Sequence, residues 1–113
     1  MTQRCFNAIL EMLKSDMVSR GLIAQCFKES ENGLLLSTSQ ESEILRRLLA
    51  SDGIAIGDPN LLRPDYVEFV GWIGTVEERV RRAMDAVATS VGHDKEFAYW
   101  VCLRKNVDRF VGA

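Results

Sequence analysis

Three stretches of the chain place apolar residues at the spacing of one helical face. The first covers residues 4–17 and is followed by Gly21, a residue type that commonly ends helices. The second begins near Thr38, which can form a capping box with Glu41, and it stops before Gly53. The spacing predicts two amphipathic helices, whose buried faces are Phe6, Ile9, Leu10, Leu13 and Met17 in the first and Ile44, Leu45, Leu48 and Leu49 in the second.

The third helix carries the clearest local signal in the sequence. Thr75 can accept a hydrogen bond from the backbone N–H of Glu78, and Glu78 can reach back to the N–H of Thr75. From this capping box the helix is expected to continue to Gly92. The residues before it, 66–73, are rich in aromatic and β-branched types and predict a strand, in which Gly71 is a candidate for a bulge or a close backbone approach.

The earlier apolar runs predict further strands. Residues 22–27 and 34–37 flank the Asn-Gly pair at 32–33, which tolerates the positive φ of a tight turn, so a β-hairpin is expected here. Residues 54–56 predict a short strand. The stretch that follows, 57–65, contains both prolines of the chain and is expected to form turns.

The C-terminal part predicts one buried strand and a short tail. Residues 96–105 form an apolar run with little alternation, which favours a central position in a sheet. The tail, 106–113, is expected to add an edge strand or a helical turn. Together these elements predict an α+β fold with a single antiparallel or mixed sheet of four to five strands and about three helices packed on it. At 113 residues the chain is expected to form one globular domain, 1–113.

Composition and overall charge exclude several classes of protein. Apolar residues make up 47% and charged residues 27% of the chain, which is typical of a folded globular domain rather than a disordered one. A net charge of −2 gives no strong attraction to nucleic acid or to anionic membranes. No apolar run approaches the length of a bilayer span, and the N-terminal residues lack the pattern of a secretory signal. We therefore expect a cytoplasmic protein with no membrane partner and no direct nucleic-acid partner.

Candidate chemical groups are few. Cys5, Cys26 and Cys102 lie far apart without a CxxC pair, so they are expected to be small buried hydrophobes rather than disulfide or zinc ligands. His93 is the only histidine, and with Asp94 it is the candidate acid–base pair. The competing interpretation is a capping or solvated loop histidine just past the end of a helix. No nucleotide-binding or phosphate-binding motif occurs, and neither a metal nor a cofactor is expected.

Two other groups of charged residues favour structural roles. The carboxylates at 52, 58 and 65 lie in predicted loops without DxD or EF-hand spacing, which is typical of turn and capping residues. Arg79, Arg81 and Arg82 on the third helix are interleaved with acidic residues, several of them four positions away. This spacing favours a solvated, self-paired helix face over a nucleic-acid contact.

Charge is distributed unevenly along the chain. Residues 29–68 hold eight acidic and three basic side chains, whereas residues 1–28 hold two acidic and four basic ones. An acidic segment on a near-neutral protein can steer a basic partner, although acidic loops also simply keep small proteins soluble. The expected partner-binding residues are the acidic Glu29, Glu31, Glu41, Glu43, Asp52 and Asp58, together with the aromatic Tyr66 and Trp72.

These features favour a non-catalytic protein-binding module over an enzyme. An inhibitor or immunity protein that neutralises a basic, nuclease-like toxin fits the charge profile, because such a toxin must be basic to hold RNA or DNA. A small-molecule-binding domain or minor enzyme that uses His93 and Asp94 is one alternative. A structural subunit that forms homodimers through an edge strand or an aromatic patch is another, so a monomer and a homodimer are both compatible with the sequence.

Overall fold

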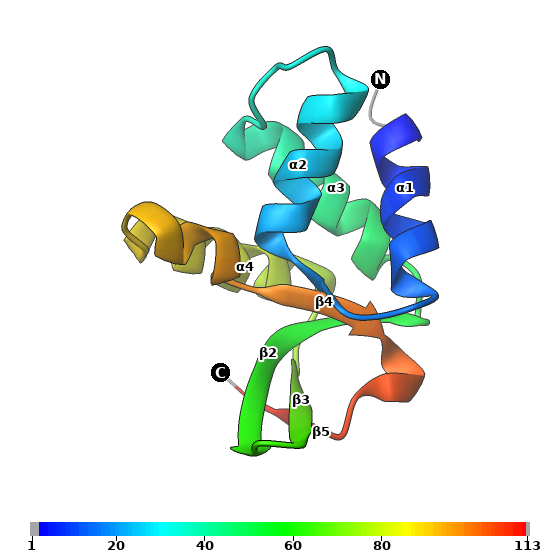
Figure 1. Cartoon of the computed structure of the whole chain (residues 1–113), viewed down its shortest axis with the longest axis vertical. Helices are drawn as coiled ribbons and strands as arrows, with labels where there is room; N and C mark the ends of the chain where they lie inside the picture. Colours follow the sequence, from blue (N-terminus) through cyan, green and yellow to red (C-terminus); the bar gives the residue numbers. More distant parts are fainter. Residues whose placement is uncertain (1–2, 113) are drawn as a thin grey trace.

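In a computed structural model, which describes residues 3–112, a mixed β-sheet packs against a layer of helices (Figure 1). The helices of this part of the chain are α1 (Gln3–Leu13), α2 (Arg20–Ser30), α3 (Thr38–Leu49), α4 (Val76–Thr89) and two short 3-10 helices, η1 (Gly92–Phe97) and η2 (Arg104–Asn106). The strands are β1 (Val18–Ser19), β2 (Ile54–Arg63), β3 (Tyr66–Trp72), β4 (Trp100–Leu103) and β5 (Arg109–Val111). The predicted α+β class is confirmed. The sheet has five strands, within the predicted range, and the described residues form four α-helices where about three were expected.

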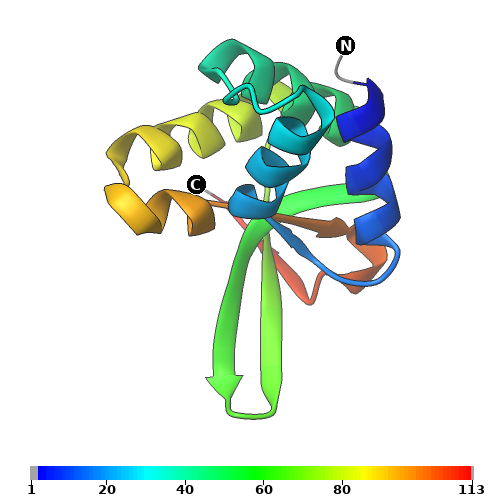
Figure 2. The ribbon, with the colours of Figure 1, turned by 45° about the horizontal axis from the view of Figure 1, so that its top comes forward.

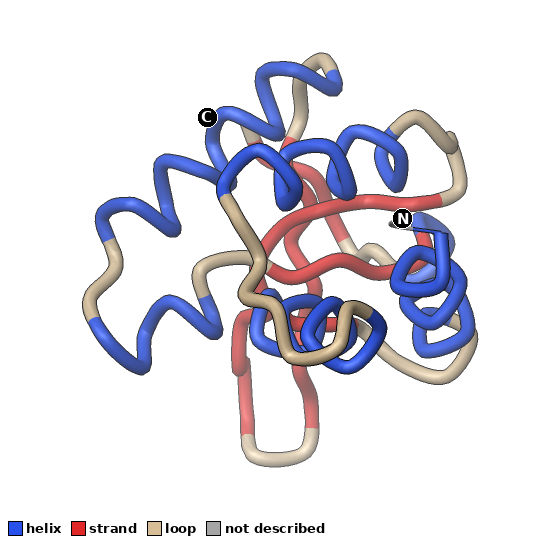
Figure 3. Tube along the Cα trace, turned by 90° about the horizontal axis from the view of Figure 1, so that it is seen from above, coloured by secondary structure: helices blue, strands red, loops and turns tan. Residues whose placement is uncertain are grey.

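The strands follow the order β1-β4-β2-β3-β5 across the sheet. Every neighbouring pair is antiparallel except β3 and β5, which are parallel. β4 therefore lies inside the sheet, as its continuous apolar run predicts, and the C-terminal tail adds an edge strand. α1, α2 and α3 lie together on one side of the central strands (Figure 1), and the view from above shows helices around the edges of the sheet (Figure 3).

The core lies between the helices and one face of the sheet. Ile56 and Val101 are cross-strand partners on this face, and both are fully buried. Ile9 of α1, Phe27 of α2 and Leu48 of α3 pack in the same core and are also fully buried. Burying a large aliphatic or aromatic side chain stabilises a fold by about 1.5–3 kcal/mol, so this layer holds the helices on the sheet.

Both predicted capping boxes mark helix starts, but one lies a residue earlier than expected. At α4, Thr75 Oγ1 accepts the N–H of Glu78 at 3.1 Å, and Glu78 Oε1 accepts the N–H of Thr75 at 2.9 Å. At α3 the capping box consists of Ser37 and Gln40. Glu41, which the sequence assigned to this box, is directed into the interior instead.

The prediction of a hairpin over residues 22–37 is wrong, because its first half is the helix α2. Ser19 caps this helix by accepting the N–H of Leu22 at 3.3 Å. Ile23 and Phe27 lie one turn apart and are both fully buried, so a helical period places the apolar residues in the core. A short apolar run fits a strand and a buried helix equally well. Here the N-cap at Ser19 favours the helix.

The residues expected to form the hairpin turn end this helix instead. Asn32 and Gly33 have φ values of 55° and 87°, and the N–H of Gly33 donates to the carbonyl of Lys28 at 2.8 Å. This is the left-handed helix ending that Asn and Gly favour. Residues 34–37 form a loop rather than a strand, and Leu35 is exposed there.

Several other boundaries differ from the predicted ones. α1 ends at Leu13, so Met17 lies in the loop before β1. α4 ends at Thr89 rather than near residue 92, and the predicted strand over residues 96–105 is shortened because 92–97 form η1. No helix within the described residues combines the length and apolar character needed to cross a membrane.

The stretch that the two prolines mark as turn-rich is mostly strand. β2 continues to Arg63 and pairs with β3, leaving only residues 64–65 for the turn. Pro59 is tolerated because β4 pairs only with residues 54–57 of β2, so Pro59 has a neighbouring strand on one side alone. The predicted turn does form, but only at the second proline, Pro64, and the residue after it.

The distal half of the β2–β3 hairpin, residues 58–68, projects from the body of the molecule (Figure 2). At its base β5 pairs only with residues 70–72 of β3. Within the described part of the chain, the distal half therefore has no third strand beside it. An isolated two-stranded ribbon is marginally stable in water, so this projection depends on contacts at its base.

Two glycines at the base of the hairpin allow close packing. Gly57 and Gly71 are cross-strand partners, and a Cβ atom on Gly57 would lie 2.0 Å from the carbonyl oxygen of Val70. A Cβ atom on Gly71 would lie 2.8 Å from the ring of Phe110. The close approach predicted at Gly71 is confirmed, and the neighbour is a side chain from β5.

Candidate interaction surface

The structure distributes the predicted acidic residues over several elements. Glu29 and Glu31 lie at the C-terminal end of α2, Glu43 lies on α3, and Asp52 lies in the turn before β2. Asp58 belongs to the hairpin. The α2–α3 connection and the hairpin turn lie at opposite ends of the longest axis of the molecule (Figure 1). These side chains therefore do not form one continuous acidic face.

Glu41 lies in the interior, so its assignment to a surface is corrected. Its side chain is 2% exposed and accepts hydrogen bonds from Arg20 Nε at 2.9 Å and Arg20 Nη2 at 3.0 Å. The hydroxyl of Tyr99, which is fully buried, donates to the same carboxylate at 2.6 Å. Burial and the charge of Glu41 raise the pKa of Tyr99, which keeps its hydroxyl protonated as a donor. This cluster links α2 and α3 to the residue just before β4.

Trp72 is also an internal residue, and its expected role at the surface is corrected. It is 4% exposed, and its Nε1 donates to Asp58 Oδ2 at 3.1 Å. The guanidinium of Arg82 from α4 lies 4.3 Å from the centre of the ring. A cation above an aromatic face is attracted by the ring quadrupole, so this contact helps hold α4 on the sheet. Asp58 is half-buried and serves as the partner of the indole.

Tyr66 lies at the start of β3 and is partly exposed. Its hydroxyl donates to Asp108 Oδ1 at 2.6 Å, and the N–H of Phe69 donates to Asp108 Oδ2 at 2.7 Å. The hydrogen bond from Tyr66, and then that from Phe69, lower the pKa of Asp108. Tyr66 therefore connects the hairpin to the segment before β5.

His93 and Asp94 do not form an enclosed site. The side chain of His93 is 82% exposed; its Nδ1 lies 3.7 Å from Glu96 Oε2, and its ring packs edge-on against Phe97. Asp94 is exposed as well. A solvent-exposed histidine without a surrounding pocket favours the interpretation as a loop residue over that as a catalytic base.

The three cysteines are free thiols that are buried or half-buried, as the sequence predicts. Cys5 and Cys102 are buried, and burial raises the pKa of Cys5 to about 11 and that of Cys102 to about 12. Cys26 is half-buried, and burial raises its pKa as well. Thiols with raised pKa values are protonated at neutral pH and are poor nucleophiles. Within residues 3–112 no group of three His, Cys, Asp or Glu side chains is arranged to hold a metal ion.

The most distinctive surface of the molecule is an apolar area on the projecting hairpin. We call it the hairpin surface and define it as Leu61 and Val67, which share one face of the ribbon, with Leu62 at the irregularity of the ladder beside them. Leu61 is 67% and Leu62 is 55% exposed, and Val67 lies directly across from Leu61 in the β2–β3 ladder. Sequence reasoning missed this surface because it assigned residues 57–65 to turns. The available signal was the Leu-Leu pair beside a turn, where loops are usually polar.

A groove of about 620 Å³ adjoins the hairpin surface. Its walls are Asp16 and Met17 from the loop before β1, Pro59, Leu61 and Val67 from the hairpin, and Trp100 from β4. Met17 and Asp16 also border the smaller depressions on either side of this loop. The groove therefore extends the apolar area of the hairpin onto the body of the molecule.

Comparisons with known proteins place the chain in no established group: no protein-family model, no curated protein and no solved structure matches it.

Proposed function

We propose that this protein is a non-catalytic binding module that docks onto a basic protein partner through the hairpin surface and the adjoining groove. The observation that carries the proposal is the exposure of neighbouring apolar side chains on a projection that, within residues 3–112, has no third strand beside it. Single exposed apolar residues are ordinary, whereas a contiguous apolar area on a protruding element is characteristic of interaction sites.

The groove provides a place for partner side chains to bury. Met17 is flexible and polarizable, and Trp100 offers a large aromatic surface. Binding energy in protein interfaces concentrates where aromatic and apolar side chains enter such depressions, surrounded by contacts that exclude water. The hairpin surface and the groove together supply this combination of a protruding and a hollowed area.

Charge around the hairpin favours a basic partner. Asp16 lies in the groove, Asp58 lies on β2, and Asp65 lies in the turn. Arg63 is the only basic residue of the hairpin and is 3.2 Å from Asp65, in an exposed pair that contributes little to stability. An apolar area with a surplus of negative charge is complementary to an apolar patch flanked by Lys or Arg.

The narrower form of the proposal is that the partner is a nuclease-like toxin and that this protein is its inhibitor or immunity protein. Its support is the negative charge beside the hairpin and the net charge of −2. A nuclease must carry a basic surface to hold its substrate, and an acidic protein can occupy that surface. This form predicts that adding the purified protein abolishes the nucleolytic activity of the captured partner. Adding the Leu61→Ser variant at the same concentration should leave that activity intact.

Site-directed photo-crosslinking tests the docking surface. A photo-reactive amino acid replaces Leu61 in the full chain produced in its native host, and in a matched control it replaces Leu35. Leu35 is also apolar and is 79% exposed, but it lies in the α2–α3 connection at the other end of the molecule. We expect position 61, and not position 35, to give a discrete adduct with a protein rich in Lys and Arg.

Charge variants then test whether long-range electrostatic attraction speeds the association of the two captured proteins. Asp65→Lys should slow association more than it speeds dissociation, whereas Glu29→Lys should leave both rates unchanged at physiological ionic strength. The reason is that the molecule extends 39 Å along its longest axis, while charges are screened within about 8 Å at 0.15 M salt. An adduct between two copies of this chain, equal adducts from positions 35 and 61, or no adduct at all would contradict the proposal.

A further inference from the structure

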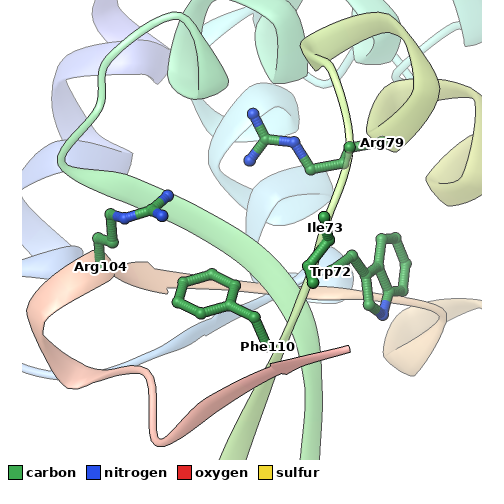
Figure 4. Close-up of a pocket in the computed structure, with 6 residues that line it drawn as sticks. Trp72, Ile73, Arg79, Arg104 and Phe110 are labelled. Carbon is green, nitrogen blue, oxygen red and sulfur yellow. The ribbon is translucent and has the colours of Figure 1, made fainter. Parts of the chain in front are cut away.

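A second depression, away from the groove, gathers positive charge. Its walls are Trp72 of β3, Ile73 and Gly74 of the β3–α4 connection, Arg79 of α4, Arg104 of η2 and Phe110 of β5, and its volume is about 320 Å³. Figure 4 shows the guanidinium groups of Arg79 and Arg104 reaching into this space from opposite sides, with the Phe110 ring beside Arg104. We call this depression the arginine pocket.

Most hydrogen-bond donors of the two arginines are unused within the described residues. Arg79 uses Nε for a hydrogen bond to the carbonyl of Thr75 at 3.3 Å, and its terminal Nη groups donate to no described residue. The guanidinium of Arg104 lies 4.6 Å from the centre of the Phe110 ring and forms neither a hydrogen bond nor an ion pair within residues 3–112. Each side chain is therefore positioned by one contact while most of its N–H groups face the pocket.

The pocket brings two like charges together, and the nearby carboxylates of Glu78 and Asp108 already accept hydrogen bonds from other groups. Burial, and then the positive charge of Arg104, lower the pKa of Arg79. Glu78 lies beside Gly74, but its carboxylate accepts the N–H of Thr75 in the capping box of α4. Asp108, two residues before Phe110, is likewise bound by Tyr66 and Phe69. An anion bound between the arginines would remove this repulsion.

We propose that the arginine pocket binds a phosphate monoester of a small organic molecule. Two convergent guanidinium groups match the charge and the oxygen geometry of a phosphate dianion better than those of a single carboxylate. The volume exceeds that of a phosphate group alone, and Ile73, which is exposed, and Phe110 provide apolar walls for the organic part. This inference is independent of the proposed docking surface, since the two sites share no residue.

An NMR titration at constant ionic strength tests the site, with inorganic phosphate, phenyl phosphate and benzoate as the probes. We expect the backbone amide signals of Ile73 and Gly74 to shift saturably with both phosphates. Phenyl phosphate should bind more tightly than inorganic phosphate, because the organic group contacts the apolar walls. Benzoate, with one charge, should bind at least about tenfold more weakly than phenyl phosphate.

Neighbouring basic residues provide a matched pair of variants. Arg104→Gln should weaken phenyl phosphate binding at least about tenfold, whereas Lys105→Gln should leave it unchanged. Both residues are exposed and lie in the same short helix, but Lys105 does not line the pocket. Both variants should keep the melting temperature of the unchanged protein.

Several results would overturn the assignment. These are the absence of saturable shifts with either phosphate, an equal loss in Lys105→Gln, and tighter binding of benzoate than of phenyl phosphate. Arg79→Gln provides a second variant from a different element, and its amide spectrum reports whether the fold is kept. If it is kept and phenyl phosphate binds as before, Arg79 has no part in the site and the proposal fails.

Discussion

The buried carboxylate of Glu41 illustrates how single residues hold this fold together. Three hydrogen bonds reach it, two from Arg20 and one from Tyr99. Exposed ion pairs such as Lys14 with Glu11 are screened by water and contribute little. The buried cluster differs because any member left alone in the interior would retain unsatisfied polar groups.

Removing the carboxylate should therefore be strongly destabilising. Glu41→Ala leaves the guanidinium of Arg20 and the hydroxyl of Tyr99 without their shared partner, and we expect the free energy of unfolding to fall by about 3–5 kcal/mol. Urea denaturation measures this change. Glu43→Ala, an exposed position in the same helix, should change it by no more than about 0.5 kcal/mol. Equal effects of the two substitutions would show that the buried cluster contributes nothing special.

The glycine pair at the base of the hairpin gives a second prediction for single residues. In Gly57→Ala the new methyl group would overlap the carbonyl oxygen of Val70, so the two strands must separate. We expect a loss of about 3 kcal/mol in the free energy of unfolding. In Gly53→Ala the nearest atom, Ser51 Oγ, is 3.6 Å away, and the change should stay within about 0.5 kcal/mol. A Gly57→Ala protein as stable as the unchanged one would show that the strands tolerate separation.

Among the secondary-structure elements, the hairpin and the C-terminal segment stabilise each other. The hydroxyl of Tyr66 and the N–H of Phe69, both on β3, donate to Asp108, which precedes β5. Because these bonds favour the ionised form, the pKa of Asp108 is lower in the folded chain than in the unfolded one. The resulting stabilisation is complete above the unfolded-state pKa, about 3.9, and is lost as the pH falls through the lower folded-state pKa.

This linkage predicts a pH-dependent effect of Tyr66→Phe. The variant lacks the donor, so the difference in its free energy of unfolding from the unchanged protein should be largest above pH 4. The difference should shrink in more acidic solution, where Asp108 becomes protonated. Urea denaturation at a series of pH values measures it. A difference that does not vary with pH would mean that the contact makes no electrostatic contribution.

Elements whose signals lie within a few residues could be predicted from the sequence. The capping box of Thr75 and Glu78 located the start of α4, and the aromatic and β-branched run before it located β3. α2 could not be assigned with the same security, because the short run 22–27, in which only Gln25 is polar, fits a helix and a strand alike. β2 was underestimated because two prolines indicate turns, while the pairing that makes Pro59 acceptable becomes visible only in the folded sheet.

The candidate sites were less predictable than the elements, for the same physical reason. Glu41 contacts Tyr99, which is 58 positions away in the chain, so no local pattern distinguishes its carboxylate from an exposed one. Arg79 lies on α4, which follows β3, and Arg104 directly follows β4, so the order β4-β2-β3 in the folded sheet is needed to bring both to one pocket. Sequence spacing suggested that the α4 arginines pair with their own helix, and it could not show the pocket that Arg79 enters.

For the whole molecule, the arrangement of charge and shape separates two possible interaction sites. The acidic residues near the end of α2 and those of the hairpin lie at opposite ends of a molecule 39 Å long. At physiological ionic strength these groups act independently, so the acidic middle of the sequence does not behave as one surface. The hairpin surface is apolar with acidic neighbours, whereas the arginine pocket is basic and shares no residue with the hairpin surface or its groove.

The strand order also has a consequence for how the chain is made. β1 pairs with β4 alone, and β4 lies between β1 and β2, although it is among the last elements in the sequence. A nascent chain therefore leaves the ribosome with its first strand unmatched and one side of β2 bare. The middle of the sheet can assemble only after residue 103 has emerged, so folding of this domain has to wait until nearly all of residues 3–112 have been synthesised.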